Sequence, residues 1–229
     1  MINLPATQLD AVKLSIIVSM LSTILVLPIA IAIAWKLARS RFYGKSVVEA
    51  LISIPLVLPP VVTGYFLLLI LGRNGFVGRY LWDSFGLQLS FTWYGAAVAA
   101  AVVSFPLGVR AIRQAFESVD PKFDDVACTL GASKLKRFIT IHIPLAKPGL
   151  IAGTLLVFAR SLGEFGATIT FVGNIPGETR TIPLAIYSTL QRPNGESESM
   201  TLVLCSVSLS VLAVLLGEFY LSAHKREMK

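Results

Sequence analysis

The chain is 229 residues long, with 55% hydrophobic residues and only 14% charged residues. Soluble domains carry about 25% charged residues, so this composition excludes an ordinary soluble globular protein and indicates a membrane protein with several spans. The formal net charge is +7. Because the basic residues cluster beside apolar runs, membrane topology explains this charge, and we expect no nucleic-acid partner.

Apolar segments that are uncharged or nearly so mark the predicted transmembrane helices. In chain order they are Leu14–Trp35, Ala50–Gly72, Ser84–Val109, Pro148–Phe171 and Ser199–Gly217. A helix crosses the hydrocarbon core of a bilayer in about 20 residues, so each segment is long enough to span it. The sequence therefore predicts an all-α polytopic membrane protein with five transmembrane helices, which form one domain over residues 1–229 in the lipid bilayer.

The loops between these segments differ in their lysine and arginine content. The first and third loops, residues 36–45 and 110–147, hold eleven such residues, whereas the second and fourth, 73–83 and 172–198, hold four. Basic residues are retained on the cytoplasmic side of a membrane. We therefore expect the first loop, the third loop and the C-terminus in the cytoplasm, and the N-terminus outside.

The second predicted span contains Pro55, Pro59 and Pro60. Proline removes a backbone donor and disturbs the preceding helical turn, and in lipid the freed carbonyl groups need other partners. Two interpretations remain open. Either Pro59 and Pro60 lie in a kinked helix that lines a translocation path, or the kink is a static feature of a buried helix.

The fourth predicted span carries two charged residues, Arg160 and Glu164. They are four residues apart, which places them on one face of a continuous helix. Arg160 lies about 18 Å along this helix from Pro148, a depth at which charged side chains usually face the bundle interior or a cavity. Either the pair lines the path or its gate, or it is an internal salt bridge that fixes the rotation of the helix.

The segment that follows, residues 172–198, is rich in glycine, proline and small hydroxyl residues. It is long for a connection between helices. We expect it to form a gate or a docking surface on the outer face, with a plain solvated loop as the alternative.

A polar segment, residues 121–144, separates the third and fourth spans and contains DDVACTLGASKLKRFITIHIP. It holds a helix-forming run (123–130), then Gly131, which permits a sharp turn, and then a basic amphipathic run (133–141) that ends at Pro144. The apolar side chains available for burial in the second run are Leu135, Phe138 and Ile139. We expect a cytoplasmic element on which a soluble partner acts, although an ordinary amphipathic helix at the membrane surface also fits.

Motifs for catalysis and metal binding are absent from the sequence. It has no G-x-x-x-x-G-K-[ST] loop, no Ser-His-Asp set, no H-E-x-x-H and no paired carboxylates. Its cysteines and histidines, Cys128, Cys205, His142 and His224, show no metal-ligand spacing. The sequence therefore predicts a protein that is not an enzyme, with no catalytic residue, no metal and no cofactor of its own.

The polar segment resembles the signature loop of ABC-importer permeases, Glu-Ala-Ala-x3-Gly-x9-Ile-x-Leu-Pro. Asp, Val and Ile stand here for the signature Glu, second-position Ala and Leu, and the aspartate is one methylene shorter than glutamate. The resemblance assigns contact with an ATPase to the residues that occupy the signature positions, which are Asp125, Ala127, Gly131, Ile141 and Pro144.

Further stretches narrow the resemblance. Residues 158–183, FARSLGEFGATITFVGNIPGETRTIP, are similar to the permease subunits of molybdate importers almost residue for residue, whereas sulfate permeases diverge over NIPGETRTIP. The stretches SIPLVLPPVVTGY at 53–65 and SFPLGVRAIRQAFE at 104–117 also look like this subfamily. The resemblance extends over residues 14–218.

The resemblance implies a type I ABC-importer permease fold and a location in the bacterial inner membrane. It also implies a homodimer that engages two ABC ATPase subunits on the cytoplasmic face, where the ATP is bound, and an extracytoplasmic binding protein that selects molybdate. The chain would then form the path for molybdate, and for tungstate, an oxyanion of nearly the same size.

Other functional classes remain open. A sulfate or thiosulfate ABC permease would share the architecture. An ATP-independent secondary anion transporter or channel would show flux without ATP and inverted repeats, which the sequence does not display. A non-transporting scaffold or receptor would need neither the proline-rich span nor the Arg160/Glu164 pair.

Overall fold

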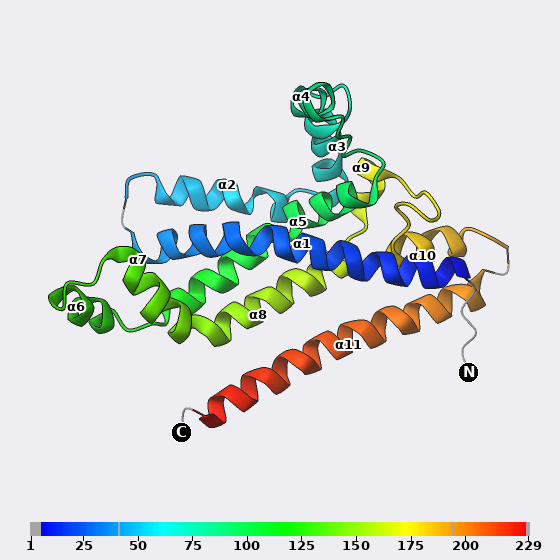
Figure 1. Cartoon of the computed structure of the whole chain (residues 1–229). Coiled ribbons are helices and arrows are strands. Elements are labelled where there is room, and N and C mark those ends of the chain that lie inside the picture. The colour runs from blue at the N-terminus through cyan, green and yellow to red at the C-terminus, as the bar shows by residue number, and fades with distance from the viewer. Residues whose placement is uncertain (1–5, 41, 194, 228–229) are drawn as a thin grey trace.

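The computed structural model describes residues 6–40, 42–193 and 195–227, and every regular element within these ranges is helical (Figure 1). The all-α prediction is therefore confirmed for the described residues. The sequence predicts that the N-terminus lies outside and the C-terminus lies in the cytoplasm. Residues 1–5 and 228–229 at these two ends are outside the described ranges. The elements are α1 (Ala6–Arg39), α2 (Lys45–Val57), α3 (Pro60–Leu71), α4 (Phe76–Phe85), α5 (Trp93–Glu117), α6 (Lys122–Thr129), α7 (Lys134–Arg137), the π-helical turn η1 (Phe138–His142), α8 (Ile143–Leu162), α9 (Gly166–Val172), α10 (Ile182–Leu190) and α11 (Glu196–Glu227).

Four stretches of described helix are long and apolar enough to cross a bilayer: α1, α5, α11, and the continuous helix from Lys134 to Leu162 that joins α7, η1 and α8. The pair α2 and α3 also passes this test together, but the two helices are bent by 108° relative to each other. If the bent pair counts as one span, the described residues hold the five spans that the sequence predicts.

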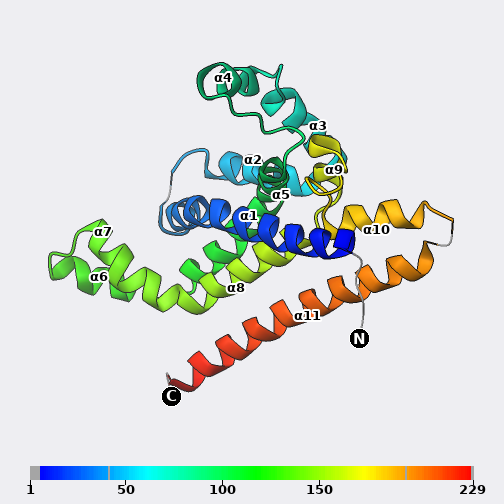
Figure 2. The same cartoon turned by 45° about the vertical axis from the view of Figure 1, so that its right-hand side comes forward.

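Three of these helices, α1, α5 and α8, pack along one another and form the central frame of the molecule (Figures 1 and 2). Small and aliphatic side chains fill the contacts between them. In lipid there is no hydrophobic driving force between helices, and small side chains let them approach closely enough to associate by packing. Buried residues of this frame include Val26, Ala30, Ala34, Val109, Ile112 and Val157.

The last helix, α11, meets this frame mainly along α8. Only 11% of its most apolar stretch is buried within the chain. Large apolar side chains such as Leu212, Leu215 and Leu216 are more than half exposed. In a membrane protein such a surface contacts lipid or another subunit.

The predicted boundaries of the third and fourth spans are wrong. The third span begins at Trp93 rather than Ser84, because the preceding residues form the separate helix α4, which ends at Gly86 with a φ of 65°. The hydroxyl of Thr92 then caps α5 by accepting a hydrogen bond from the backbone N–H of Gly95 at 3.1 Å. The fourth span begins at Lys134 instead of Pro148 and ends at Leu162 instead of Phe171.

The segment between α9 and α11 is not a plain solvated loop, because it contains α10. The hydroxyl oxygen of Ser15 on α1 accepts a hydrogen bond from the N–H of Ile182 at 2.7 Å, which ties α10 to the frame. Before α10, the Nε of Arg180 donates to Asn174 Oδ1 at 2.8 Å. Burial, and then the nearby charge of Arg192, lower the pKa of Arg180. The predicted gating or docking role of this segment stays a prediction.

Candidate functional site

The second predicted span is broken rather than kinked. α2 ends at Val57 and α3 begins at Pro60, with Leu58 and Pro59 extended between them (ψ 143° and 133°). A residue before proline is driven out of the helical region, and a proline at the first helical position needs no N–H partner. The dipeptide Pro59-Pro60 therefore ends one helix and starts the next, whereas Pro55 is accommodated within α2.

A second break separates α8 from α9 and contains Glu164. The sequence places Arg160 and Glu164 on one face of a continuous helix, and this is wrong because α8 ends between them. They form an ion pair nevertheless, with 2.7 Å between Arg160 Nη1 and Glu164 Oε2. The other carboxylate oxygen, Oε1, accepts the backbone N–H of Ala167 at 2.8 Å, so Glu164 also caps the first turn of α9.

The two members of this pair differ in exposure. The side chain of Glu164 is 2% exposed and that of Arg160 is 30% exposed. Both oxygens of the buried carboxylate have partners, which a buried charge requires. A guanidinium carries five N–H donors in a planar fork, and within the described residues this one makes no polar contact besides the ion pair. The arrangement can offer N–H donors to an anion while the carboxylate stays in place.

The two breaks meet in space, because α3 and α9 lie side by side (Figures 1 and 2). Two glycines permit the contact. A Cβ on Gly64 would lie 2.6 Å from the carbonyl oxygen of Ala167, and a Cβ on Gly166 would lie 2.7 Å from Cβ of Pro60. The structure thus brings the predicted path residues of the second and fourth spans into one region, which sequence reasoning had treated separately.

A hydroxyl cluster missed by sequence reasoning lies next to this region. Ser161, the residue after Arg160, has its Oγ 2.8 Å from Ser22 Oγ and 3.2 Å from Ser104 Oγ. All three side chains are buried, and they come from α8, α1 and α5. The cluster joins the three frame helices with satisfied polar contacts. The signal in the sequence that could have indicated this cluster is the presence of serines within otherwise apolar spans.

The polar segment, residues 121–144, lies at the other end of α8, about 30 Å away at 1.5 Å of rise per residue. We name it the coupling segment after the contact with an ATPase that the signature resemblance predicts. Gly131 has a φ of 76° and makes the predicted turn between α6 and α7. Of the signature residues, Asp125 is exposed, Ala127 is buried and Ile141 is half-buried. Pro144 is exposed, in the first turn of α8.

The sequence predicts that the basic run ends at Pro144, but the helix continues past this residue. α7, η1 and α8 form one continuous helix, because Pro144 sits in the first turn after the π-helical residues, where its missing N–H is tolerated. Phe138 turns inward and packs against Trp35, with ring centroids 4.7 Å apart. The exposed apolar side chains of the segment are Phe123, Val126, Leu130, Leu135 and Ile139, all more than half exposed.

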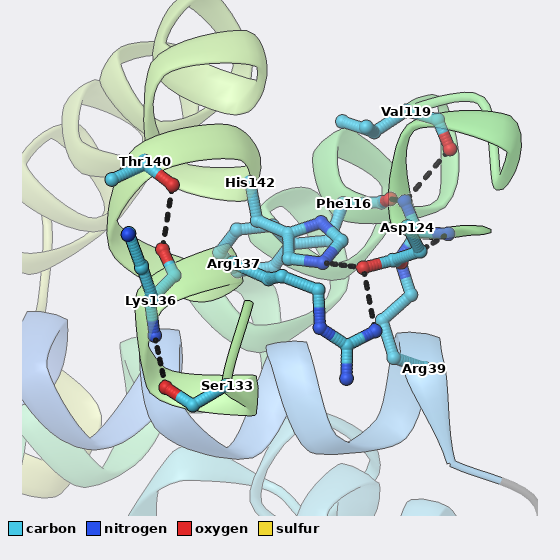
Figure 3. A network of polar contacts seen from close by, with 9 residues as sticks. All are labelled: Arg39, Phe116, Val119, Asp124, Ser133, Lys136, Arg137, Thr140 and His142. Atoms are coloured by element: carbon cyan, nitrogen blue, oxygen red, sulfur yellow. Dashed lines mark hydrogen bonds and ion pairs between the residues drawn. The ribbon is translucent and has the colours of Figure 1, made fainter. Parts of the chain in front are cut away.

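Asp124 anchors this segment to the rest of the chain (Figure 3). Its Oδ1 accepts hydrogen bonds from Arg137 Nη1 at 3.2 Å and from His142 Nε2 at 3.1 Å. Its Oδ2 lies 3.8 Å from Nη1 of Arg39 on α1. The sequence analysis does not identify Asp124 as a site residue, and it considers His142 only as a metal ligand. No sequence motif indicates that the two residues pair.

Broken helical spans around a packed frame, together with a polar segment that presents apolar side chains, define a membrane transport component. The chain belongs to the family described as binding-protein-dependent transport system inner membrane components, whose profile matches residues 14–227. The predicted family is therefore confirmed. The predicted type I ABC-importer permease fold is confirmed by the solved ABC-transporter chains that share it. The chain is a permease component rather than an enzyme.

Individual relatives agree with this placement. The chain is 54% identical over 212 residues to the molybdenum transport system permease protein ModB of Haemophilus influenzae, covering 93% of each protein. It is 38% identical over 181 residues to the sulfate transport system permease protein CysT of Salmonella typhimurium, covering 79% of this chain and 65% of that protein. A solved chain of a bacterial ABC transporter involved in the import of the acidic polysaccharide alginate matches with a TM-score of 0.72 at 16% identity, covering 98% of this chain and 81% of that one.

Proposed function

We propose that this chain forms the membrane path of an ABC importer for molybdate, and for tungstate, whose oxyanion is nearly the same size. The observation that carries the proposal is identity at more than half of the aligned positions, over nearly the full length, to a molybdenum transport permease. The sulfate permease is less similar and aligns over a smaller share of both chains. This difference favours molybdate over the sulfate or thiosulfate alternative.

The proposed assembly contains two copies of the chain, two ABC ATPase subunits and one extracytoplasmic binding protein. Each chain has one coupling segment, so engaging two ATPases takes a homodimer. The exposed apolar side chains of α6 and α7 support the contact, since a helix laid in a groove of the ATPase would bury them. The ATPases bind the ATP, and this chain needs no cofactor.

The proposed location is the bacterial inner membrane, with the coupling segment in the cytoplasm. The basic residues of the loop 110–147 support this orientation, because positive charge is retained on the cytoplasmic side. The N-terminus then lies outside and the C-terminus inside. The ordered segment before α10 lies on the outer face, where the binding protein docks.

The proposed path runs past the two helix breaks. Molybdate carries two negative charges, and lipid is closed to it. Arg160, whose side chain is 30% exposed, offers N–H donors to the oxyanion, and Glu164, which is buried, holds the guanidinium in position. Pro59 and Pro60 are both exposed, and Pro60 lies against Gly166. In the proposed path they form the opposite wall.

The proposed cycle is alternating access. Closure of the two ATPases on ATP draws the two coupling segments together and rocks the spans so that the path opens outward, and hydrolysis resets it. Ligand and ATP shift this equilibrium only as far as they bind one state better than the other.

Uptake of radiolabelled molybdate into proteoliposomes tests the proposal. The vesicles hold this chain, its ATPase and its binding protein, and each component is omitted in turn with sulfate as competitor. We expect uptake to require all three components and ATP, and to resist excess sulfate. Uptake without ATP would establish a secondary transporter or channel, and uptake abolished by sulfate would move the substrate to the sulfate branch.

A further inference from the structure

Two adjacent carboxylates in the first turn of α6 face different surroundings. Asp125 is exposed, and within the described residues its side chain makes no hydrogen bond or ion pair. Asp124 is 19% exposed and holds three basic side chains. The signature resemblance concerns Asp125 alone. Asp124, in contrast, makes its contacts within the chain, so its role differs from that of Asp125.

The contacts of Asp124 extend to the whole frame. Arg39, which faces it from the end of α1, also donates from Nη2 to the carbonyl oxygens of Phe116 at 3.1 Å and Val119 at 2.7 Å. These carbonyls lie at the C-terminal end of α5, where helical partners are missing and a cation is favoured. Arg137 and His142 carry the contact into the helix that continues as α8. One carboxylate thus connects α6 with α1, α5 and α8.

An aromatic layer backs this network. Trp35 and Phe116 contact His142, with ring centroids 6.1 Å and 6.5 Å from the imidazole. Phe138 extends the layer and lies 6.2 Å from Phe116. The π-helical turn puts Phe138 and His142 on the same side, since both contact Trp35. Aromatic cover excludes water from one side of the ionic contacts and strengthens them.

Apolar packing contributes little to holding α6 itself. Ala127 is the one buried residue among the eight of this helix, and Phe123 and Val126 are more than half exposed. A force applied to α6 therefore reaches the frame through the polar contacts of Asp124, the turn at Gly131 and the four-residue connection to α5, residues 118–121.

We propose that Asp124 is a positioning residue that makes the coupling segment and the frame of α1, α5 and α8 move as one body. Asp125, next to it, contacts the ATPase. The inference rests on the proposed function, since it assigns one step of that cycle. Without the Asp124 contacts the ATPases still close and hydrolyse ATP, but α6 moves without the spans.

Asp124→Asn and Asp125→Asn make a matched pair for the test, because each removes one charge from adjacent positions on the same helix. The complete complex with ATPase and binding protein is placed in proteoliposomes. ATP hydrolysis stimulated by the loaded binding protein and molybdate uptake are measured in the same vesicles. The deciding quantity is uptake per ATP hydrolysed.

For Asp124→Asn we expect this ratio to fall about tenfold, within the range of about 5- to 150-fold that coupling between two sites usually spans. For Asp125→Asn we expect less bound ATPase, with hydrolysis and uptake falling together and the ratio unchanged. Asp124→Glu keeps the charge and should restore most of the ratio. A merely structural role would lower the amount of complex or both activities in parallel.

The inference is overturned if Asp124→Asn leaves the ratio unchanged, whether both activities persist or both fall in parallel. If Asp124→Asn is not recovered from the membrane, Arg137→Gln serves instead, because it removes one partner and leaves Arg39 and His142 in place. A smaller fall in the ratio supports the inference, and no fall overturns it. Absence of molybdate uptake by the unsubstituted complex would refute the proposed substrate separately, and the ratio would then be measured with sulfate.

Discussion

The coupling segment and the paired helix breaks are held by different kinds of contact. At the coupling segment, the side chains of Arg39, Arg137 and His142 meet Asp124 at 3.1 to 3.8 Å. Asp124 and the two arginines are 17–19% exposed, whereas His142 is 2% exposed. At the breaks, backbones approach closely at Gly64 and Gly166, and the carboxylate of Glu164 is 2% exposed with 2.7 Å to its cation.

This difference affects how well each region tolerates substitution. Asp124 and its two arginines keep some exposure to water, which can replace part of a lost contact there. At the breaks the carboxylate of Glu164 is buried, and the closest contacts are between backbones, which have no alternative rotamer. We therefore expect the break region to tolerate substitution least and the coupling segment to tolerate it more.

Glu164→Gln should have the largest effect on stability. The substitution removes the charge that balances Arg160. Breaking a buried ion pair costs about 3–5 kcal/mol, and because Arg160 is 30% exposed we expect the lower end of this range. Denaturant titration of the purified complex in detergent measures the change. The exposed pair Arg79 and Asp83, also four residues apart at 3.6 Å, provides the control, and Asp83→Asn should change little.

The same Glu164→Gln protein tests the proposed path. If the assembled variant transports molybdate as the unsubstituted complex does, Glu164 does not hold a guanidinium needed for transport, and the pair is only the internal salt bridge that the sequence left open.

Gly64→Ala should have the next largest effect. The new methyl group would lie 2.6 Å from the carbonyl oxygen of Ala167, so α3 and α9 must separate. Overpacking of this kind costs about 1–3 kcal/mol. Gly163→Ala is the matched control, because the nearest atom to its Cβ would be 4.0 Å away. Equal stability of the two variants would show that the breaks do not depend on close approach.

Gly131→Ala should have the smallest effect of the three. The residue has a φ of 76° and nothing within 4 Å of a Cβ, so the only penalty is the left-handed conformation, about 1–2 kcal/mol. The fraction of ATPase that copurifies with the complex reports on the turn. Gly131→Asn, which tolerates this conformation, should bind more ATPase than Gly131→Ala. The reverse order would mean that the turn is not what presents α7.

Local features of the structure could be predicted from the sequence. The spans follow from composition, since each helix must be apolar enough for lipid on its own. Pro59-Pro60 marks the first break and Gly131 marks the turn in the coupling segment. The charge pair of the fourth span was also found, although its geometry was predicted on a helix that in fact ends at Leu162.

Contacts between distant parts of the chain came only from the tertiary structure. Arg39 and Asp124 are 85 positions apart, and Gly64 meets Ala167 across two breaks. The π-helical turn that carries the helix past Pro144 has no sequence signal either. Composition and periodicity describe how one helix meets lipid. Which residues of two helices meet depends on their packing, and packing is a property of the whole bundle.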